Sequence, residues 1–291
     1  MKIALRVSVN TNLGFNVGVP NLKAILKKYG ANATFFIPMH QDSKLRSLKL
    51  FWQLAKLGGF KSFSANIFDQ RTSAPVKQTW VDIIKILRKE GFEVGVSSCS
   101  CAEWYSNSRT ATAKWIKKQY EKANLTFQEI LEESPISSGA PFFQMNREAY
   151  RQNQKYNFRY TSDTIGFKPF IPIYEGEIIA CPQIPVTLPK ITDLLVREKL
   201  TCSMALSELE KRILTQSHNI YDVTAEIEGI RLIDIFEKLL NIITKKNKIQ
   251  IVSLIEYLES SVENLPQHEL KIGVRSCHLK SVDRQGSEFL A

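Results

Sequence analysis

Short apolar runs alternate with amphipathic stretches along most of the chain. The first two runs, Ile3–Val9 and 31–38, are predicted strands, and the stretch between them predicts a helix from about Val19 to Tyr29. Pro20 suits the first turn of that helix, and Gly30 suits its end. A strand, a helix and a second strand in succession predict a parallel sheet.

The same alternation continues to about residue 253 and predicts one α/β domain. Further helices are predicted at Val76–Lys89, 111–133, 146–156, Met204–Ser217 and Ile230–Lys246. Further strands are predicted at Phe92–Val96, Pro135–Ser138, Phe158–Ser162, Asn219–Ala225 and Ile249–Ser253, with two short apolar segments at Glu177–Ala180 and Gln183–Val186. About seven strands alternating with helices favour an irregular (β/α) barrel. Residues 259–291 have no such pattern, so we expect a loosely held polar C-terminal tail that contains Cys277.

The strand Phe92–Val96 runs directly into five small polar residues, Ser97 to Cys101. The carboxyl ends of parallel strands form the functional face of such folds. This segment contains no His, Asp or Lys. Serines and thiols alone make neither a hard-metal site nor a general base, so the sequence predicts an unusual site at this edge.

Composition indicates a folded protein of the cytoplasm. Hydrophobic residues make up 44% of the 291 residues and charged residues 23%, which is typical of globular domains. No apolar run approaches the roughly 20 residues that cross a bilayer, and no signal peptide is evident. Five irregularly spaced cysteines fit reduced thiols better than a disulfide framework.

The net charge of +10 predicts an anionic partner, which charge alone does not identify. Nucleic acid is the least favoured, because no nucleic-acid-binding module is recognisable. A basic segment at 43–61, within an insertion around 40–75, places Lys44, Arg46, Lys49 and Lys56 among apolar and aromatic residues. This composition is typical of a helix in a membrane interface, but also of a helix packed on its own domain.

Several sequence blocks resemble the polysaccharide deacetylase family. They are LRVSVNT, GVPNLKAIL, ATFF, EVGV, FRYTSDTIG, PQIPVTLP and YDVTAEIEG, and they span residues 2–258. The blocks RYTSD and PQIPVTLP are most similar to the branch that deformylates formamido-arabinose on undecaprenyl phosphate. The resemblance implies an irregular (β/α)7 barrel and a membrane-contacting insertion at 40–75.

The resemblance also implies a metal-dependent amide hydrolysis whose residues this chain lacks. In that family an Asp and two His hold a divalent metal (Zn, Co, Mn or Ni), a second Asp is the base, an Arg orients it, and a late His is the acid. The base, arginine and acid positions fall on Ser8, Gln144 and Thr224, and the metal-ligand positions fall on Asn10, Ser97 and Cys101. We therefore expect no catalytic residue at the first three positions, no metal ligand at the others, and no cofactor.

Two rebuilt sites remain as alternatives. Cys99 and Cys101 are soft ligands that zinc accepts, but a catalytic zinc normally takes three protein ligands. A cysteine nucleophile needs a base such as His within hydrogen-bond reach, and the sequence places none near these strand ends. Buried, inert thiols are the simpler interpretation.

These observations favour a catalytically inactive deformylase-like protein of a bacterial envelope pathway. We expect it to bind an undecaprenyl-phosphate-linked sugar or an active deacetylase relative, as a peripheral protein on the cytoplasmic face of the inner membrane. Candidate contacts to substrate or lipid are Arg6, Arg159, Asp163 and the basic side chains of the 43–61 segment. The alternative is an active hydrolase that removes a formyl or acetyl group from an amino-sugar lipid by an atypical site.

Overall fold

The structure, a computed structural model, describes residues 1–40, 78–261, 264–274 and 281–289. Its helices are α1 (Val19–Lys28), α3 (Gln78–Lys89), α4 (Cys101–Asn107), α5 (Ala113–Leu131), α6 (Arg147–Lys155), α7 (Cys202–Thr215), α8 (Ile233–Asn241) and α9 (Leu254–Ser261). Short helical turns are η1 (Gly14–Gly18), η3 (Pro141–Phe143), η4 (Asp193–Arg197), η5 (Ile227–Arg231) and η6 (Ile242–Lys246).

Seven strands form one parallel sheet that curls into a half-barrel. They are β1 (Lys2–Ser8), β2 (Thr34–Ile37), β3 (Glu93–Val96), β4 (Ser137–Ser138), β5 (Tyr160–Thr161), β8 (Ile220–Thr224) and β9 (Gln250–Val252). The order is β5-β4-β3-β2-β1-β8, and β9 also pairs with β1. The predicted α/β class is confirmed. Each strand that the sequence predicts with a helix after it is also present in this sheet.

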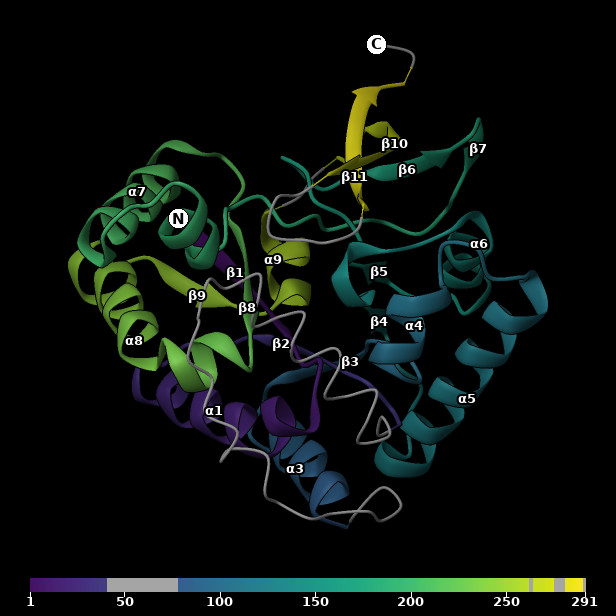
Figure 1. Ribbon diagram of the computed structural model, residues 1–291, viewed down its shortest axis with the longest axis horizontal. Coiled ribbons are helices and arrows are strands. Elements are labelled where there is room, and N and C mark those ends of the chain that lie inside the picture. Colours follow the sequence, from purple (N-terminus) through teal and green to yellow (C-terminus); the bar gives the residue numbers. More distant parts are fainter. Residues whose placement is uncertain (41–77, 262–263, 275–280, 290–291) are drawn as a thin grey trace.

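Helices surround the sheet on its outer side (Figure 1). The largest core cluster lies between them and the strands, and includes Leu5, Phe35 and Val94 of the sheet. Helices begin where the sequence supplies a cap: the Ser100 side chain accepts from the Glu103 N–H at α4, and Thr112 accepts from Trp115 N–H at α5. The predicted helix 230–246 is real but divided, since η5 and η6 flank α8.

The amino ends of the strands are closed by α9 around one buried carboxylate. Glu93 accepts hydrogen bonds from the hydroxyls of Thr34 (2.6 Å), Ser137 (2.9 Å) and Tyr160 (2.5 Å). It also accepts from the backbone N–H of Ile255, in the first turn of α9, at 3.1 Å. Carboxylates are favoured at a helix N-terminus, so Glu93 connects three strands and the closing helix.

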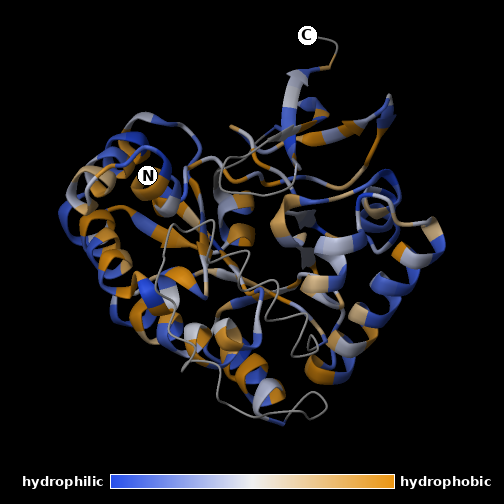
Figure 2. Cartoon of the chain, in the orientation of Figure 1, coloured by the Kyte–Doolittle hydropathy of each residue, from blue (hydrophilic) through white to orange (hydrophobic). Residues whose placement is uncertain are grey.

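A second sheet, absent from the sequence prediction, contains β6 (Ile171–Tyr174), β7 (Glu177–Ile178), β10 (Gln267–Val274) and β11 (Ser281–Glu288) in the order β11-β10-β6-β7. The expectation of a loose tail is therefore wrong for the described part of 259–291. Figure 2 shows β11 largely in hydrophilic colours, which explains the error. The segment Gln183–Val186 makes only isolated bridges to Thr161, Ile165 and Phe170.

The buried acid Asp283 fixes this second sheet to the barrel. Its carboxylate accepts from the Met145 N–H at 2.8 Å and pairs with Arg109 at 2.9 Å. Arg109 also donates to the Met145 carbonyl at 2.7 Å. Burial raises the pKa of Asp283 to about 6, although Arg109 opposes the shift. The loop that carries Gln144 is thus held in place by the end of the chain.

Candidate functional site at the carboxyl ends of the strands

The carboxyl ends of β1 and β8 lie side by side and present polar side chains to the barrel interior. Arg6 pairs in register with Asp222, and Ser8 pairs with Thr224. Alternate residues of a strand share a face, so these four side chains lie on one face. The structure thus brings together Ser8 and Thr224, the positions that match the family's base and acid.

A buried ion cluster, formed by Arg6, Asp222 and Lys190, occupies this face. Asp222 contacts the Arg6 guanidinium at 2.7 Å and the Lys190 ammonium at 2.6 Å. The side chains of Arg6 and Asp222 are 2% and 1% exposed, and that of Lys190 is 12% exposed. Lys190 also donates to the Thr224 hydroxyl at 2.8 Å, so it contacts both of the β8 residues, Asp222 and Thr224, on this face.

Arg6 extends the cluster across the barrel. Its guanidinium donates to the carbonyls of Ser162 (3.2 Å) and Ala140 (3.1 Å) and lies over the rings of Phe36 and Phe143. All directions around this side chain are therefore filled by the protein. Arg6 was expected to contact a ligand, and the structure places it inside the barrel, paired with Asp222.

Ser8 is not activated by its neighbours. Its hydroxyl donates to Asp222 at 2.6 Å and also contacts Arg6. Burial alone would raise the pKa of Asp222, but Lys190 and Arg6 outweigh burial and hold that pKa well below its ordinary value. A carboxylate with a depressed pKa is a poor proton acceptor, so the two cations weaken Asp222 as a base for Ser8.

Asn10 is held by Glu226 instead of facing a ligand. The Glu226 carboxylate accepts from the backbone N–H groups of Asn10 (2.9 Å) and Thr11 (2.7 Å) and from the Thr11 hydroxyl (2.9 Å). The Asn10 side-chain amide adds a longer contact of 3.5 Å. Gly14 is required here, because a Cβ on it would lie 2.2 Å from the Glu226 carboxylate oxygen.

Ser97 and Cys101 lie in two different surroundings. The Cys101 thiol is fully buried and donates to the Val9 carbonyl at 3.6 Å, beside the end of β1. Ser97 lines a pocket between β3 and α5. Cys99 is also buried, as the inert-thiol interpretation expects. His218 bonds Tyr257 at 3.0 Å, before the amino end of β8, which agrees with its predicted place away from these thiols.

Gln144, where the sequence resemblance implied the family arginine, is fully buried. It follows the tight turn η3, in which Phe142 and Phe143 have positive φ angles of 59° and 55°. Both polar atoms of its side-chain amide lack a hydrogen-bond partner among the described residues. Its carbonyl accepts from the Trp104 indole at 2.7 Å.

The remaining expected contacts are dispersed. Asp163 is buried and accepts from Ala140 N–H (2.7 Å), Asn153 (2.8 Å) and Gln183 (3.0 Å), and burial raises its pKa. Arg159 lies at the amino end of β5 and pairs with Glu259 on α9 at 2.7 Å, away from the carboxyl ends. Lys44, Arg46, Lys49 and Lys56 lie outside the described residues, so their role stays a prediction.

Sequence reasoning missed Lys190 and Asp222. Asp222 had a visible signal, since a lone acid within the apolar strand Ile220–Thr224 requires a partner. Glu228 accepts from the Thr224 N–H at 2.8 Å and from the Tyr221 hydroxyl at 3.4 Å. Burial raises its pKa to about 7, although Lys190 opposes the shift. Lys190 had no local signal, because its partners are more than 30 residues away.

The sequence comparisons agree with this architecture. No protein-family model matches the chain. The chain is 27% identical, over 92% of its length and 90% of the relative, to a Shewanella sediminis protein named "Probable 4-deoxy-4-formamido-L-arabinose-phosphoundecaprenol deformylase ArnD". It is 28% identical to the protein of the same name from Wigglesworthia glossinidia brevipalpis, over 89% and 93% of the two chains. The chain is therefore similar to these two proteins over nearly its whole length.

Solved structures similar to this chain show its fold. A Mycobacterium smegmatis protein named as a polysaccharide deacetylase superposes with a TM-score of 0.58 at 13% identity, over 90% of this chain and 91% of the other. BA3943, a CE4 family pseudoenzyme from Bacillus anthracis, superposes with a TM-score of 0.51 at 14% identity, over 92% and 69%. The predicted irregular barrel of the polysaccharide deacetylase type is confirmed.

The expectation of no cofactor is contradicted by a third structure. A family 4 acetyl xylan esterase from Clostridium thermocellum, with a TM-score of 0.51 and 14% identity over 89% and 91% of the chains, is in complex with a cobalt ion. A protein with this fold therefore binds a divalent metal.

The donors at Asn10, Ser97 and Cys101, the positions for which the sequence resemblance implied metal ligands, do not fit such an ion. Ser97 offers a hydroxyl, Asn10 an amide that contacts Glu226, and Cys101 a thiol that donates to a carbonyl. Within the described ranges, no three or more His, Cys, Asp or Glu residues are grouped as metal ligands. A hydroxyl and a neutral amide are poor ligands for zinc, and Cys101 alone does not supply the three protein ligands of a catalytic zinc.

Proposed function

We propose that this protein binds a sugar carried on undecaprenyl phosphate and does not hydrolyse it. The observation that carries the proposal is the ion cluster of Arg6, Asp222 and Lys190, which occupies the position between Ser8 and Thr224. Two cations lower the pKa of the carboxylate that accepts the Ser8 hydrogen bond, which makes that carboxylate a weak base. The retained barrel supports binding, because BA3943 shows that a CE4 fold persists in a pseudoenzyme.

The ligand class comes from the relatives. The name that both relatives share specifies a formamido-arabinose on phosphoundecaprenol. Phosphoundecaprenol is a membrane lipid with an anionic linkage. The net charge of +10 favours association with such a lipid and with an anionic membrane surface. Among the described helices, none combines the length and apolar character that a bilayer crossing requires. We place the protein at the cytoplasmic face of the inner membrane.

Formate release tests the catalytic half of the proposal. The purified protein is incubated with the lipid-linked formamido sugar in detergent, with Zn²⁺, Co²⁺, Mn²⁺ or Ni²⁺ added in turn. We expect no formate above the blank, whereas the Shewanella sediminis relative serves as the active control. Formate release that disappears in the Ser8→Ala variant would establish the alternative, an active hydrolase with an atypical site.

Flotation on vesicles tests the binding half. Vesicles that contain the lipid-linked sugar should retain the protein more strongly than matched vesicles with undecaprenyl phosphate alone. Equal retention on both would overturn sugar recognition and leave only attraction to an anionic surface. The Arg159→Ala variant is a matched control for charge, because Arg159 is exposed and lies at the opposite ends of the strands.

A further inference from the structure

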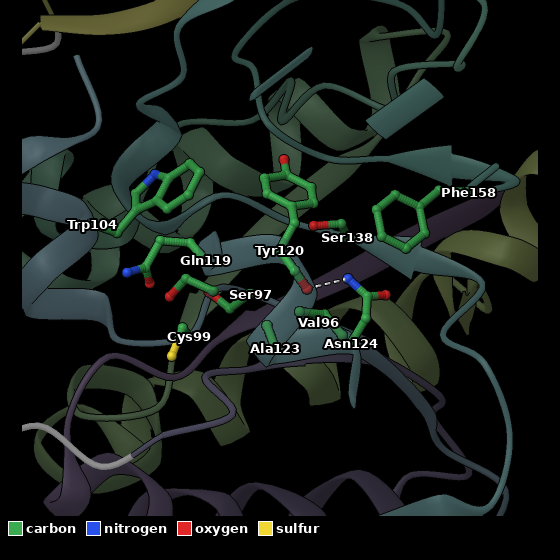
Figure 3. A pocket seen from close by; sticks show the side chains of 11 residues that line it. Val96, Ser97, Cys99, Trp104, Gln119, Tyr120, Ala123, Asn124, Ser138 and Phe158 are labelled. Atoms are coloured by element: carbon green, nitrogen blue, oxygen red, sulfur yellow. Dashed lines mark hydrogen bonds between the residues drawn. The ribbon is translucent and has the colours of Figure 1, made fainter. Parts of the chain in front are cut away.

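A small pocket opens beside Ser97, between the carboxyl end of β3 and helix α5 (Figure 3). Three aromatic side chains, Trp104, Tyr120 and Phe158, form part of its wall. The enclosed cavity measures about 10 Å³, which is room for one water-sized group. No charged side chain lines the pocket.

The pocket contains a buried acceptor without a donor. Gln119, on α5, is 8% exposed, and its Oε1 atom has no hydrogen-bond partner within the part of the chain that the structure describes. Ser97 and Ser138 also line the pocket and contribute hydroxyl groups to it. An unsatisfied buried acceptor costs about 1–3 kcal/mol, so this position requires a donor from outside the chain.

The pocket wall is fixed before any ligand arrives. The Trp104 indole donates to the Gln144 carbonyl at 2.7 Å, and the Tyr120 hydroxyl donates to Asn153 at 2.7 Å. Asn124 donates to the Tyr120 carbonyl at 2.8 Å, which is the contact drawn in Figure 3. A wall that does not reorganise loses little conformational entropy when a group binds.

We propose that this pocket is a subsite for one neutral hydrogen-bond donor of a sugar, a hydroxyl or an amide N–H, which donates to Gln119 Oε1. The size admits a single such group, and the hydroxyls of Ser97 and Ser138 complete a polar set for it. The absence of cations in the lining excludes the phosphate from this position. The inference rests on the proposed function only in taking the ligand to be a sugar.

The test uses 4-deoxy-4-formamido-L-arabinose as the free sugar, without phosphate or lipid, and measures its Kd by ligand-detected NMR. Gln119→Met keeps the side-chain length and removes the acceptor, and we expect its Kd to rise at least tenfold. This variant should fold, because it removes an unsatisfied buried atom. Gln128→Met is the matched control, since Gln128 is exposed on the same helix and should leave the Kd unchanged.

The outcomes separate this subsite from the proposed function. An unchanged Kd in Gln119→Met overturns the subsite while sugar binding itself stands. Binding of the lipid-linked sugar but not of the free sugar, with equal affinity in both variants, also overturns the subsite alone. If wild-type protein binds neither form, a resident water is the only occupant and the proposed function fails as well.

Discussion

Two carboxylates inside one barrel are stabilised in opposite ways. Asp222, at the carboxyl ends of the strands, pairs with two cations, Arg6 and Lys190. Glu93, at the amino ends, is surrounded by neutral donors: three hydroxyls and the Ile255 N–H. One end therefore depends on charge pairing, and the other on hydrogen bonds to a helix terminus and strand hydroxyls.

This difference distinguishes the two ends of the barrel by the cost of burying their carboxylates. A carboxylate held by neutral donors is a common way to close a barrel, and nothing about it requires a ligand. Burying two cations around one carboxylate costs free energy, because the desolvation penalty of each ion is offset only when the ion-pair geometry is good. This cluster lies beside Ser8 and Thr224 at the carboxyl ends of the strands, so the costly arrangement is confined to one end of the barrel.

The largest expected effect follows loss of the cluster's anion. Asp222→Asn keeps the shape but leaves Arg6 and Lys190 buried without a counter-charge. We expect a loss of about 3–5 kcal/mol in the free energy of unfolding, as for other broken buried pairs, measured by urea denaturation. The exposed pair of Arg159 and Glu259 is the control, where Arg159→Ala should cost under about 1 kcal/mol. Equal losses in the two variants would contradict the cluster's structural role.

A neighbouring carboxyl, Glu228, should make stability depend on pH in a defined direction. Burial raises its pKa to about 7, so the folded state keeps its proton more tightly than the unfolded chain. Its contribution is complete below the unfolded pKa, near 4.5, and is lost as pH rises through about 7. Each pKa unit is worth about 1.4 kcal/mol, so the full loss is on the order of 3 kcal/mol.

Glu228→Gln removes that loss and should be more stable than wild type at pH 8 but not at pH 5. Urea denaturation midpoints of both proteins at the two pH values measure this difference in stability. Asp163, Glu226 and Asp283 also have raised pKa values, so both proteins retain a shared slope in the same direction. The difference between the proteins is the test, and a constant difference across pH would show that Glu228 does not titrate in this range.

The smallest of the three effects is expected at the amino ends. Glu93→Gln keeps a carbonyl oxygen for the hydroxyl donors but brings an NH2 group against donors that need an acceptor. We expect a loss of about 1–2 kcal/mol by urea denaturation, less than for Asp222→Asn, because no buried charge is left unpaired. A larger loss than at Asp222 would reverse the comparison between the two ends.

Local pattern predicted most of the barrel but not its second sheet. The apolar strands and capped helices follow rules that act over a few residues, such as Pro20 at a helix start and Thr112 at a cap. Strand β11 has a polar sequence and is stabilised by pairing with β10 and by the buried Asp283. Such support comes from distant residues, and no local pattern reveals it.

The site residues also fall into those that the sequence revealed and those that it did not. The matched positions Ser8 and Thr224 were found from the sequence, and register places them together. Lys190 was invisible because its position depends on the fold of the segment before η4. The pocket acceptor Gln119 was equally hidden, since a glutamine within a basic helix looks like an exposed residue until the helix is seen against β3.

Asp283 also determines when the loop that carries Gln144 can reach its folded position during synthesis. The loop that carries Gln144 is held through Met145 and Arg109, which both bind a residue near the end of the chain. A ribosome adds roughly 5–20 residues each second, so this loop waits several seconds for its anchor after it emerges. The site therefore reaches its final form only after the last strand has left the ribosome.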